Sequence, residues 1–318
     1  MDSIKLVAEP ARETSTDIFV ANEVARLRTG FVNIYALGTQ ERWVLVDAGL
    51  PGYAGKIIEF AEGLFGQGTK PQAIVLTHGH FDHVGALESL LGKWDVPVYF
   101  HTLEAPYLTG LSSYPPPDPA IGGGAISYLS WLFPIKPLEL KSRVIEVREG
   151  SFIPDIPEWK IIHTPGHSPG HISLFRESDG VLIAGDAFVT VNQNALNAVI
   201  EQRKEIHGPP AYFTCDWEAA KNSVLKLKML EPSIAATGHG IPMYGEELKQ
   251  GLELLVSNFE ALSIPSHGRY VGNPAITNNK GIVEMPAPVS FYAARIAAGA
   301  LISIAVFVAV KRVIGKNK

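Results

Sequence analysis

Four side chains of the types that bind metal ions lie within six residues of this chain. They occur in the stretch THGHFDHVGAL, which follows an apolar run, and they are His78, His80, Asp82 and His83. In an extended turn, His78 and His80 point the same way because side chains alternate with period two. Asp82 and His83 then reach a neighbouring point as a helix begins. This spacing can serve two adjacent divalent ions, and such a pair activates water for hydrolysis.

Two ions need more ligands than this stretch supplies, so the prediction requires further histidines and carboxylates at other strand ends. Three turns supply them, each after an apolar run and a small residue: His167 in TPGHS, Asp186 in AGDAF and His239 in ATGHGIP. Sites of this kind are built from loops carried on a rigid sheet. The sequence therefore predicts one metal site assembled from distant turns.

The elements that must position these turns alternate between strands and helices. Short apolar runs predict buried strands at 31–37, 43–46, 73–76, 96–100, 144–147, 159–163, 172–175 and 181–183. Apolar residues at helical spacing predict helices at 54–65, 84–94, 217–230 and 246–262. This alternation is typical of an α/β fold.

The ligand motifs, in this order along the chain, resemble those of the metallo-β-lactamase superfamily of metallo-hydrolases. The resemblance covers roughly Phe31 to Leu262. It implies an αββα four-layer sandwich, with two β-sheets back to back, helices outside and two metals at one edge. It also implies a ligand set: His78, His80 and His167 for the first metal, Asp82, His83 and His239 for the second, and Asp186 as a bridge.

The resemblance further suggests residues that support the ligands. Asp47, at the end of WVLVDAGL, matches a family position that hydrogen-bonds a metal-binding imidazole. His171 is expected to act in a similar supporting role. Lactonases of the family often carry a tyrosine three residues past the bridging aspartate, where this chain has Val189.

Such a site predicts hydrolysis of an ester, lactone or thioester by a metal-bridging hydroxide, with Asp82 passing a proton to the leaving group. Zinc is the expected metal because histidine-rich ligation suits it, and iron or manganese also fits these ligands. The alternatives are a mononuclear iron dioxygenase acting on a persulfide, a β-lactamase, and a binding module without catalysis.

The amino-acid composition limits the classes of molecule that the protein is expected to bind. The formal net charge of −5 over 318 residues has no basic excess, so a nucleic-acid partner is not expected and a small acyl substrate is. Nothing in the sequence selects an oligomeric state. Cys215 is the only cysteine, which excludes an intrachain disulfide and predicts a packed thiol.

The sequence also predicts how the chain is divided into segments and where in the cell the protein is located. We expect a catalytic domain at 1–262, a linker rich in Pro, Gly and Asn at 263–288, and a hydrophobic helix at 289–314. Within the domain, 110–137 is expected to form a lid or insertion with an apolar substrate wall at 128–133. The stretch 289–310 is long and apolar enough to cross a bilayer as a helix. Since no export signal precedes the domain, we expect a cytoplasmic catalytic domain anchored to a membrane.

Overall fold

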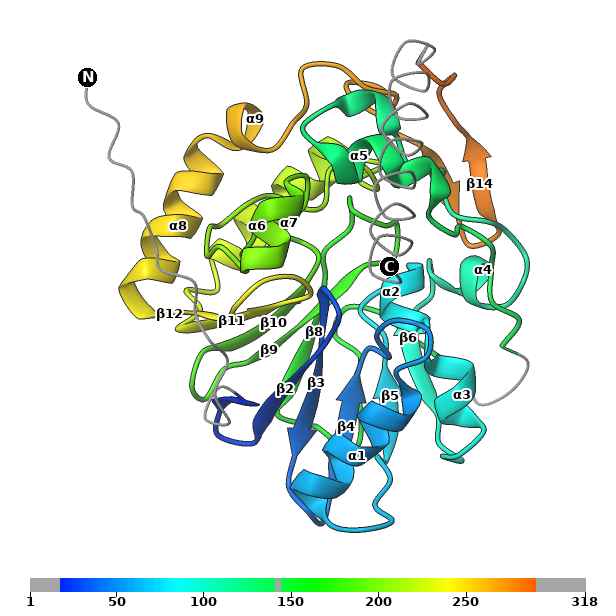
Figure 1. Ribbon diagram of the computed structural model, residues 1–318, viewed down its shortest axis with the longest axis vertical. Helices are drawn as coiled ribbons and strands as arrows, with labels where there is room; N and C mark the ends of the chain where they lie inside the picture. Colours follow the sequence, from blue (N-terminus) through cyan, green and yellow to red (C-terminus); the bar gives the residue numbers. More distant parts are fainter. Residues whose placement is uncertain (1–17, 141–143, 290–318) are drawn as a thin grey trace, which may run out of the picture.

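Two β-sheets packed face to face form the centre of the protein, and helices cover both outer faces (Figure 1). The computed structural model describes residues 18–140 and 144–289. The first sheet has seven strands in chain order: β1 (Phe19–Ala21), β2 (Val24–Thr29), β3 (Val32–Gly38), β4 (Trp43–Val46), β5 (Ala73–Val75), β6 (Val98–His101) and β7 (Val144–Val147). Its strands are antiparallel from β1 to β4 and parallel from β4 to β7.

The second sheet has five strands in the order β12-β11-β10-β9-β8. They are β8 (Trp159–His163), β9 (Ile172–Arg176), β10 (Val181–Gly185), β11 (Ile234–Thr237) and β12 (Met243–Tyr244). Only β10 and β11 pair in parallel among these strands. A separate hairpin consists of β13 (Ile276–Asn278) and β14 (Gly281–Glu284).

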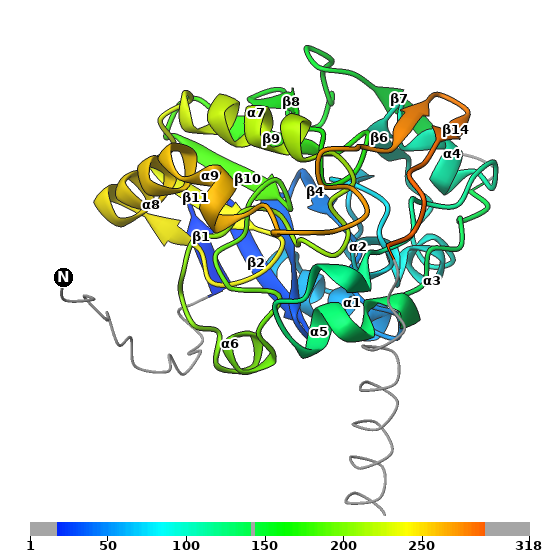
Figure 2. The same cartoon turned by 90° about the horizontal axis from the view of Figure 1, so that it is seen from above.

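Helices on both sides complete the layers (Figure 2). Residues of α1 (Ala54–Phe65) and α3 (Leu87–Leu91) pack on the first sheet, and residues of α7 (Trp217–Lys228) and α8 (Gly245–Ser257) pack on the second. The shorter helices are α2 (Phe81–Val84), α4 (Ala105–Leu108), α5 (Ala125–Leu129), α6 (Leu196–Glu201) and α9 (Phe259–Leu262), with 3-10 turns η2 (Pro119–Ile121) and η3 (Ser130–Leu132).

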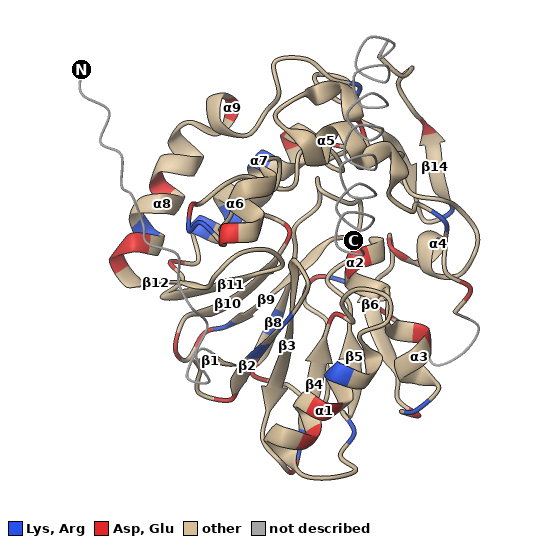
Figure 3. Ribbon diagram, viewed as in Figure 1, with Lys and Arg blue, Asp and Glu red and all other residues tan. Residues whose placement is uncertain are grey.

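Strand alternation divides the core into layers. On β4, Val44 and Val46 lie in the core between the two sheets, whereas Trp43 and Leu45 lie in the core beneath α1 and α3. A third core joins the outer face of the second sheet to α7 and α8. Charged residues gather on the outer helices, while the inner strands carry few of them (Figure 3). The predicted α/β sandwich of four layers is confirmed.

Most predicted elements occur where the apolar pattern placed them, and the differences have local causes. The predicted helix at 84–94 is interrupted, because α2 ends before Gly85 and α3 begins at Leu87. At Gly85 the backbone passes so close to Pro51 that a Cβ would collide with its ring. The predicted helix at 246–262 is likewise divided into α8 and α9 at Asn258.

The segment 263–288, predicted as a linker, makes specific contacts with the body of the protein. It contains the hairpin β13–β14. Tyr270 is buried and donates a hydrogen bond from its hydroxyl to the carbonyl of Pro116, and the Ala275 amide donates to the carbonyl of Cys215. Cys215 itself is a packed thiol, as expected.

The prediction of a membrane anchor is wrong. Within residues 18–140 and 144–289, no helix is long and apolar enough to cross a membrane. The longest helix in this part, α8, has 13 residues, which gives about 20 Å of length against a hydrocarbon core of about 30 Å. The hydrophobic helix predicted at 289–314 lies, apart from Val289, outside the described residues. The finding also corrects the predicted membrane partner and the membrane-anchored location.

Candidate metal centre

The predicted ligand turns meet at one edge of the sandwich. In the first sheet, β5 leads into the turn with His78 and His80. In the second sheet, β8, β10 and β11 lead into the turns with His167, Asp186 and His239. Since β8 and β10 are both antiparallel to β9, and β11 is parallel to β10, these three strands end at the same edge. Topology therefore brings together residues up to 161 positions apart, from His78 to His239.

The ligand atoms of these side chains form close groups among the described residues. Each group is buried, its atoms lie within 4.8 Å of one another, and the groups are His78–His80–His167, His78–His83–Asp186 and Asp82–His83–His239. In the first, Nδ1 of His80 lies 3.0 Å from Nε2 of His167. In the last, Oδ2 of Asp82 lies 3.5 Å from Nε2 of His239. Two of the three groups are the ligand sets that the resemblance implied.

Asp186 lies between those two sets. Its Oδ2 is 3.5 Å from Nε2 of His167 and 3.1 Å from Nε2 of His239. Its Oδ1 is 3.6 Å from Nε2 of His83. The approach requires a glycine at position 238, because a Cβ there would collide with Oδ1 of Asp186. Asp186 can therefore contact ions held by either set.

Asp47 supports two of the histidines. Its Oδ2 accepts hydrogen bonds from Nδ1 of His83 at 2.8 Å and from the Thr77 hydroxyl at 2.8 Å, and its Oδ1 accepts from the Thr77 amide at 2.7 Å. With its proton donated to Asp47, the Thr77 oxygen accepts from Nδ1 of His78 at 3.1 Å. This network assigns the ring protons of His78 and His83 to Nδ1 and leaves Nε2 as the free ligand atom.

His171 supports Asp186 through the backbone. Its Nε2 accepts from the Asp186 amide at 2.8 Å, and its Nδ1 donates to the Thr164 hydroxyl at 2.8 Å. The Thr164 hydroxyl continues to Ser173 at 3.0 Å. His171 thus fixes the start of the Asp186 turn.

His239 is oriented in a comparable way. Its Nδ1 donates to the carbonyl of Phe31 at 2.9 Å, which turns Nε2 toward Asp82 and Asp186. The turn itself is held by Asn33, whose Nδ2 donates to the carbonyls of Thr237 at 3.0 Å and Gly240 at 2.7 Å.

The residues present fit a metal ion. Among the described residues, Nε2 of His78, Nε2 of His83 and Oδ1 of Asp186 are buried without a hydrogen-bond partner. Leaving such atoms unpaired is costly in a protein interior. These are the same atoms that the networks behind them turn into the site, so a cation bound between them removes the cost.

The charges of the cluster differ between the two sets. Burial and the neighbouring imidazoles of His83 and His80 hold the pKa of His78 well below its ordinary value. Burial alone would also lower the pKa of His83, but Asp186, Asp47 and Asp82 outweigh it and raise that pKa well above the ordinary value. The first set therefore offers neutral imidazoles, and the second concentrates negative charge that a cation would balance.

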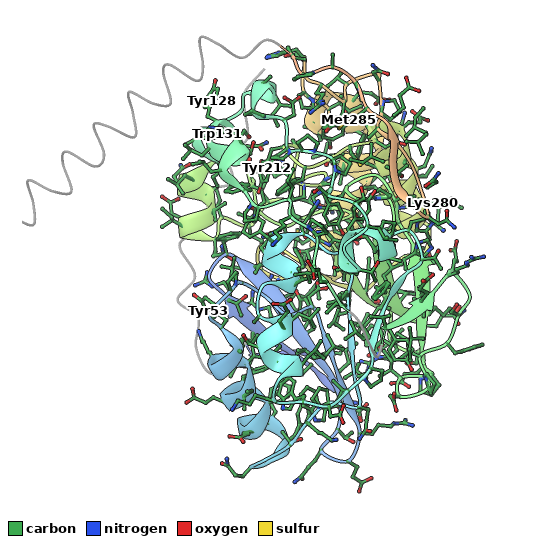
Figure 4. All side chains as sticks on the ribbon, turned by 90° about the vertical axis from the view of Figure 1, so that its right-hand side faces the viewer. Tyr53, Tyr128, Trp131, Tyr212, Lys280 and Met285 are labelled. Atoms are coloured by element: carbon green, nitrogen blue, oxygen red, sulfur yellow. The ribbon has the colours of Figure 1, made fainter. Side chains whose placement is uncertain are left out.

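Aromatic residues surround the cluster. The ring of Phe213 stacks on His80 with centroids 4.3 Å apart, and Phe133 lies 5.3 Å from Phe81 and 6.0 Å from Phe213. Of the predicted wall at 128–133, Phe133 thus faces the site, whereas Tyr128 and Trp131 lie at the protein surface (Figure 4).

Tyr212 is a site residue that the sequence analysis missed. It is buried, its ring packs on Phe133 and Phe213, and burial together with Asp82 and Asp186 raises the pKa of its hydroxyl well above the ordinary value. The only sequence signal is an aromatic pair in GPPAYFTC, which has no ligand residue to mark it.

A cavity adjoins the ligand turn. It has a volume of about 360 Å³, and its lining includes Gly79, Phe81 and Val84 from the ligand turn and Pro134 and Leu138 from a second segment. Glu88, Lys136 and Glu139 also line it. Gly79 and Phe81, which line the cavity, are the residues on either side of His80 in the sequence.

The comparisons with known proteins agree with this geometry. A family model described as the metallo-beta-lactamase superfamily matches residues 27–239. The chain belongs to the metallo-β-lactamase superfamily. The matched region ends at His239 and includes every predicted ligand of this superfamily site.

Relatives in the superfamily match most of the chain. The Bacillus subtilis protein named "Probable metallo-hydrolase YflN" is 46% identical over 76% of this chain and 93% of its own length. A metallo-β-lactamase family protein from Thermus thermophilus is 19% identical, with a TM-score of 0.54 over 76% of this chain and 81% of its own. A β-lactamase domain protein from Burkholderia ambifaria is 22% identical, with a TM-score of 0.53 over 76% of each chain. The two solved structures establish the fold.

Proposed function

We propose that this protein is a metal-dependent hydrolase that cleaves an ester, lactone or thioester bond in a small acyl substrate. The observation that carries the proposal is the pair of buried ligand sets that meet at Asp186, with ligand atoms left unpaired by the surrounding hydrogen bonds. The similarity to YflN, whose name describes a metallo-hydrolase, supports the reaction class. The proposed catalytic domain spans residues 1–262.

The proposal assigns each ligand to an ion. His78, His80 and His167 would hold one divalent ion, Asp82, His83 and His239 would hold a second, and Asp186 lies where it would contact both. Zinc suits these nitrogen and oxygen ligands best, and iron or manganese is the alternative. Asp47 and His171 hold the ligands in place through the contacts described above.

Ions bound in this way supply Lewis acidity, which activates water near neutral pH and polarises a carbonyl. The protein's own groups supply the remaining steps. The Asp82 carboxylate, whose Oδ2 lies 3.5 Å from Nε2 of His239, would take up a proton and deliver it to the leaving oxygen or sulfur. The Tyr212 hydroxyl, on a buried ring that packs on Phe133 and Phe213, would donate to the substrate oxygen.

The surroundings set what kind of substrate fits. Phe81, Phe133 and Phe213 make the approach to His80 apolar and exclude water from it. The cavity of about 360 Å³ beside the ligand turn is large enough for a short acyl chain. Phe81, Val84 and Leu138 in its lining can contact a hydrophobic acyl group.

The test begins with the metal content of the purified protein, followed by kinetics on a panel of aryl esters, lactones and thioesters. We expect two ions per chain. His80→Ala and Asp186→Ala should each lower kcat by more than about 100-fold, because mutating a residue that only supports a metal ligand already lowers activity by about 10- to 100-fold. His267→Ala, which removes an exposed histidine, is the matched control. One iron per chain with oxygen uptake on a persulfide would instead support a dioxygenase and refute the proposal.

A further inference from the structure

Glu104 is a buried carboxylate with hydrogen-bond donors on every side. It precedes α4 and is 0% exposed. Its Oε1 accepts from the Ser168 hydroxyl at 2.8 Å and from the Gly170 amide at 2.8 Å. Its Oε2 accepts from the Gly79 amide at 3.0 Å and from the Tyr114 hydroxyl. Burial raises the pKa of Glu104, but these four donors oppose that effect.

The four donors belong to three separate parts of the chain. Gly79 lies between His78 and His80. Ser168 and Gly170 lie in the turn that carries His167. Tyr114 comes from the 110–137 segment, and its ring also packs against His80 with centroids 4.6 Å apart. A single carboxylate therefore joins the two turns that carry the first ligand set.

Glycine is required where this carboxylate meets the turns. A Cβ at Gly170 would lie 2.7 Å from the Glu104 amide nitrogen and 2.8 Å from its Cγ. A Cβ at Gly79 would lie 2.5 Å from the Tyr114 hydroxyl. Both approaches are too close for any side chain, so the backbone amides reach Glu104 and Tyr114 directly.

We propose that Glu104 is a positioning residue for the first metal: it fixes the ligand turn of His80 against that of His167. The two ligand nitrogens lie 3.0 Å apart, on turns that have no strand in common. Their separation therefore depends on what connects the turns behind them. This inference rests on the proposed function, because it assumes that these histidines hold an ion.

The chemistry of the donors requires a carboxylate at this position. Each oxygen of Glu104 faces one hydroxyl, which can reverse its bond, and one backbone amide, which cannot. Glu104→Gln has nearly the same size, but its NH₂ group must face either the Gly79 amide or the Gly170 amide. One ligand turn is then pushed away from the other, and we expect a 10- to 100-fold loss of affinity for the first ion.

The experiment measures cobalt(II) binding by the full-length protein, using competition with a chromogenic chelator and the visible absorption spectrum of the bound ion. We expect Glu104→Gln to weaken one of two binding events and to change the spectrum of that ion. Asp118→Asn is the matched control, because Asp118 is also a buried carboxylate that accepts two amides, those of Ala120 and Arg269. It does not contact a ligand turn, so its variant should lose stability and keep both affinities and the spectrum.

Two milder variants separate positioning from folding. Ser168→Ala and Tyr114→Phe each remove one hydroxyl donor and leave both amide bonds to Glu104. Each should shift the first affinity in the same direction as Glu104→Gln but by less, and either carries the test if Glu104→Gln does not fold by near-UV circular dichroism. Wild-type affinity and spectrum in all three variants would overturn the positioning role. A wild-type protein that binds no cobalt would instead overturn the proposed function.

Discussion

The substitution Asp47→Asn tests how the site keeps its ligand nitrogens free. Asp47 has a φ of 64°, a left-handed conformation that asparagine tolerates better than most residues. The variant therefore keeps the backbone and the side-chain shape. Its remaining oxygen can still accept from the Thr77 amide, as Oδ1 of Asp47 does at 2.7 Å. The new NH₂ group takes the place of Oδ2.

At that position the NH₂ group meets two donors. Nδ1 of His83 and the Thr77 hydroxyl both lie 2.8 Å from Oδ2 of Asp47. To avoid two opposed donors, His83 must move its proton to Nε2, the atom that it offers to the ion. The variant therefore loses about one hydrogen bond to a charged group, which contributes about 1.5 to 3 kcal/mol. This free energy corresponds to a decrease in metal affinity of roughly 10- to 150-fold.

The assay is chelator competition on the purified protein, with unfolding of the metal-free form measured in parallel. We expect the affinity for the ion held by Asp82, His83 and His239 to fall by that factor. Asp118→Asn again serves as the control for removing a buried carboxylate. If Asp47→Asn binds both ions as tightly as the wild type, the hydrogen-bond directions assigned around His83 are wrong.

Two further predictions concern residues outside the ligand set. Tyr212→Phe removes the hydroxyl and keeps the ring packing, so it should lower kcat by about 100-fold while the metal content stays unchanged. Tyr270→Phe is the control and should leave kcat unchanged, because the Tyr270 hydroxyl bonds the carbonyl of Pro116. Equal losses of kcat in the two variants, measured by steady-state kinetics, would refute the role of Tyr212. Burial, with His163 and Arg148, lowers the pKa of His101 to about 4, so below about pH 6.5 the unfolded chain binds a proton that the folded chain does not. Through this group, the free energy of unfolding should fall by about 2 kcal/mol between about pH 7.5 and 5. In urea denaturation, the free energy of unfolding of His101→Gln should fall by about 2 kcal/mol less than that of the wild type over the same pH range.

The ligand turns were predictable because each carries its own chemical signal. His167, Asp186 and His239 are metal-binding types that directly follow apolar runs, and strand ends of one sandwich meet at an edge. The strands themselves followed from continuous burial, as at Trp43–Val46, where the four residues are buried on both faces. The local apolar pattern was therefore sufficient to predict a strand such as Trp43–Val46, in which every residue is buried.

Strand β2 shows where the local pattern fails. Its sequence VARLRT contains Arg26, which is only 5% exposed and donates to the carbonyl of Gly240 at 3.3 Å. A buried arginine breaks the apolar run that marks a strand, yet here it supports the His239 turn from 214 positions away. Its partner is fixed by the fold, and no property of neighbouring residues indicates it.

Glu104 was not predictable for the same reason. In the sequence it stands before APYL and resembles any acidic residue at a helix start, while its partners are 10 to 66 positions away. A carboxylate reveals its role only when the donors around it are known. Sequence patterns therefore indicated the side chains that gather in the buried His/Asp groups and missed several residues that hold those side chains in place.

The two buried carboxylates divide the support of the ligand turn between them. Asp47 accepts the amide of Thr77, and Glu104 accepts the amide of Gly79, so the backbone is held on either side of His78. Beyond that shared turn their contacts diverge, because Asp47 bonds His83 of the second set and Glu104 bonds the turn of His167 in the first. Loss of Asp47 should therefore weaken mainly the second ion, and loss of Glu104 mainly the first. A site held by general rigidity alone would lose both ions together in either variant.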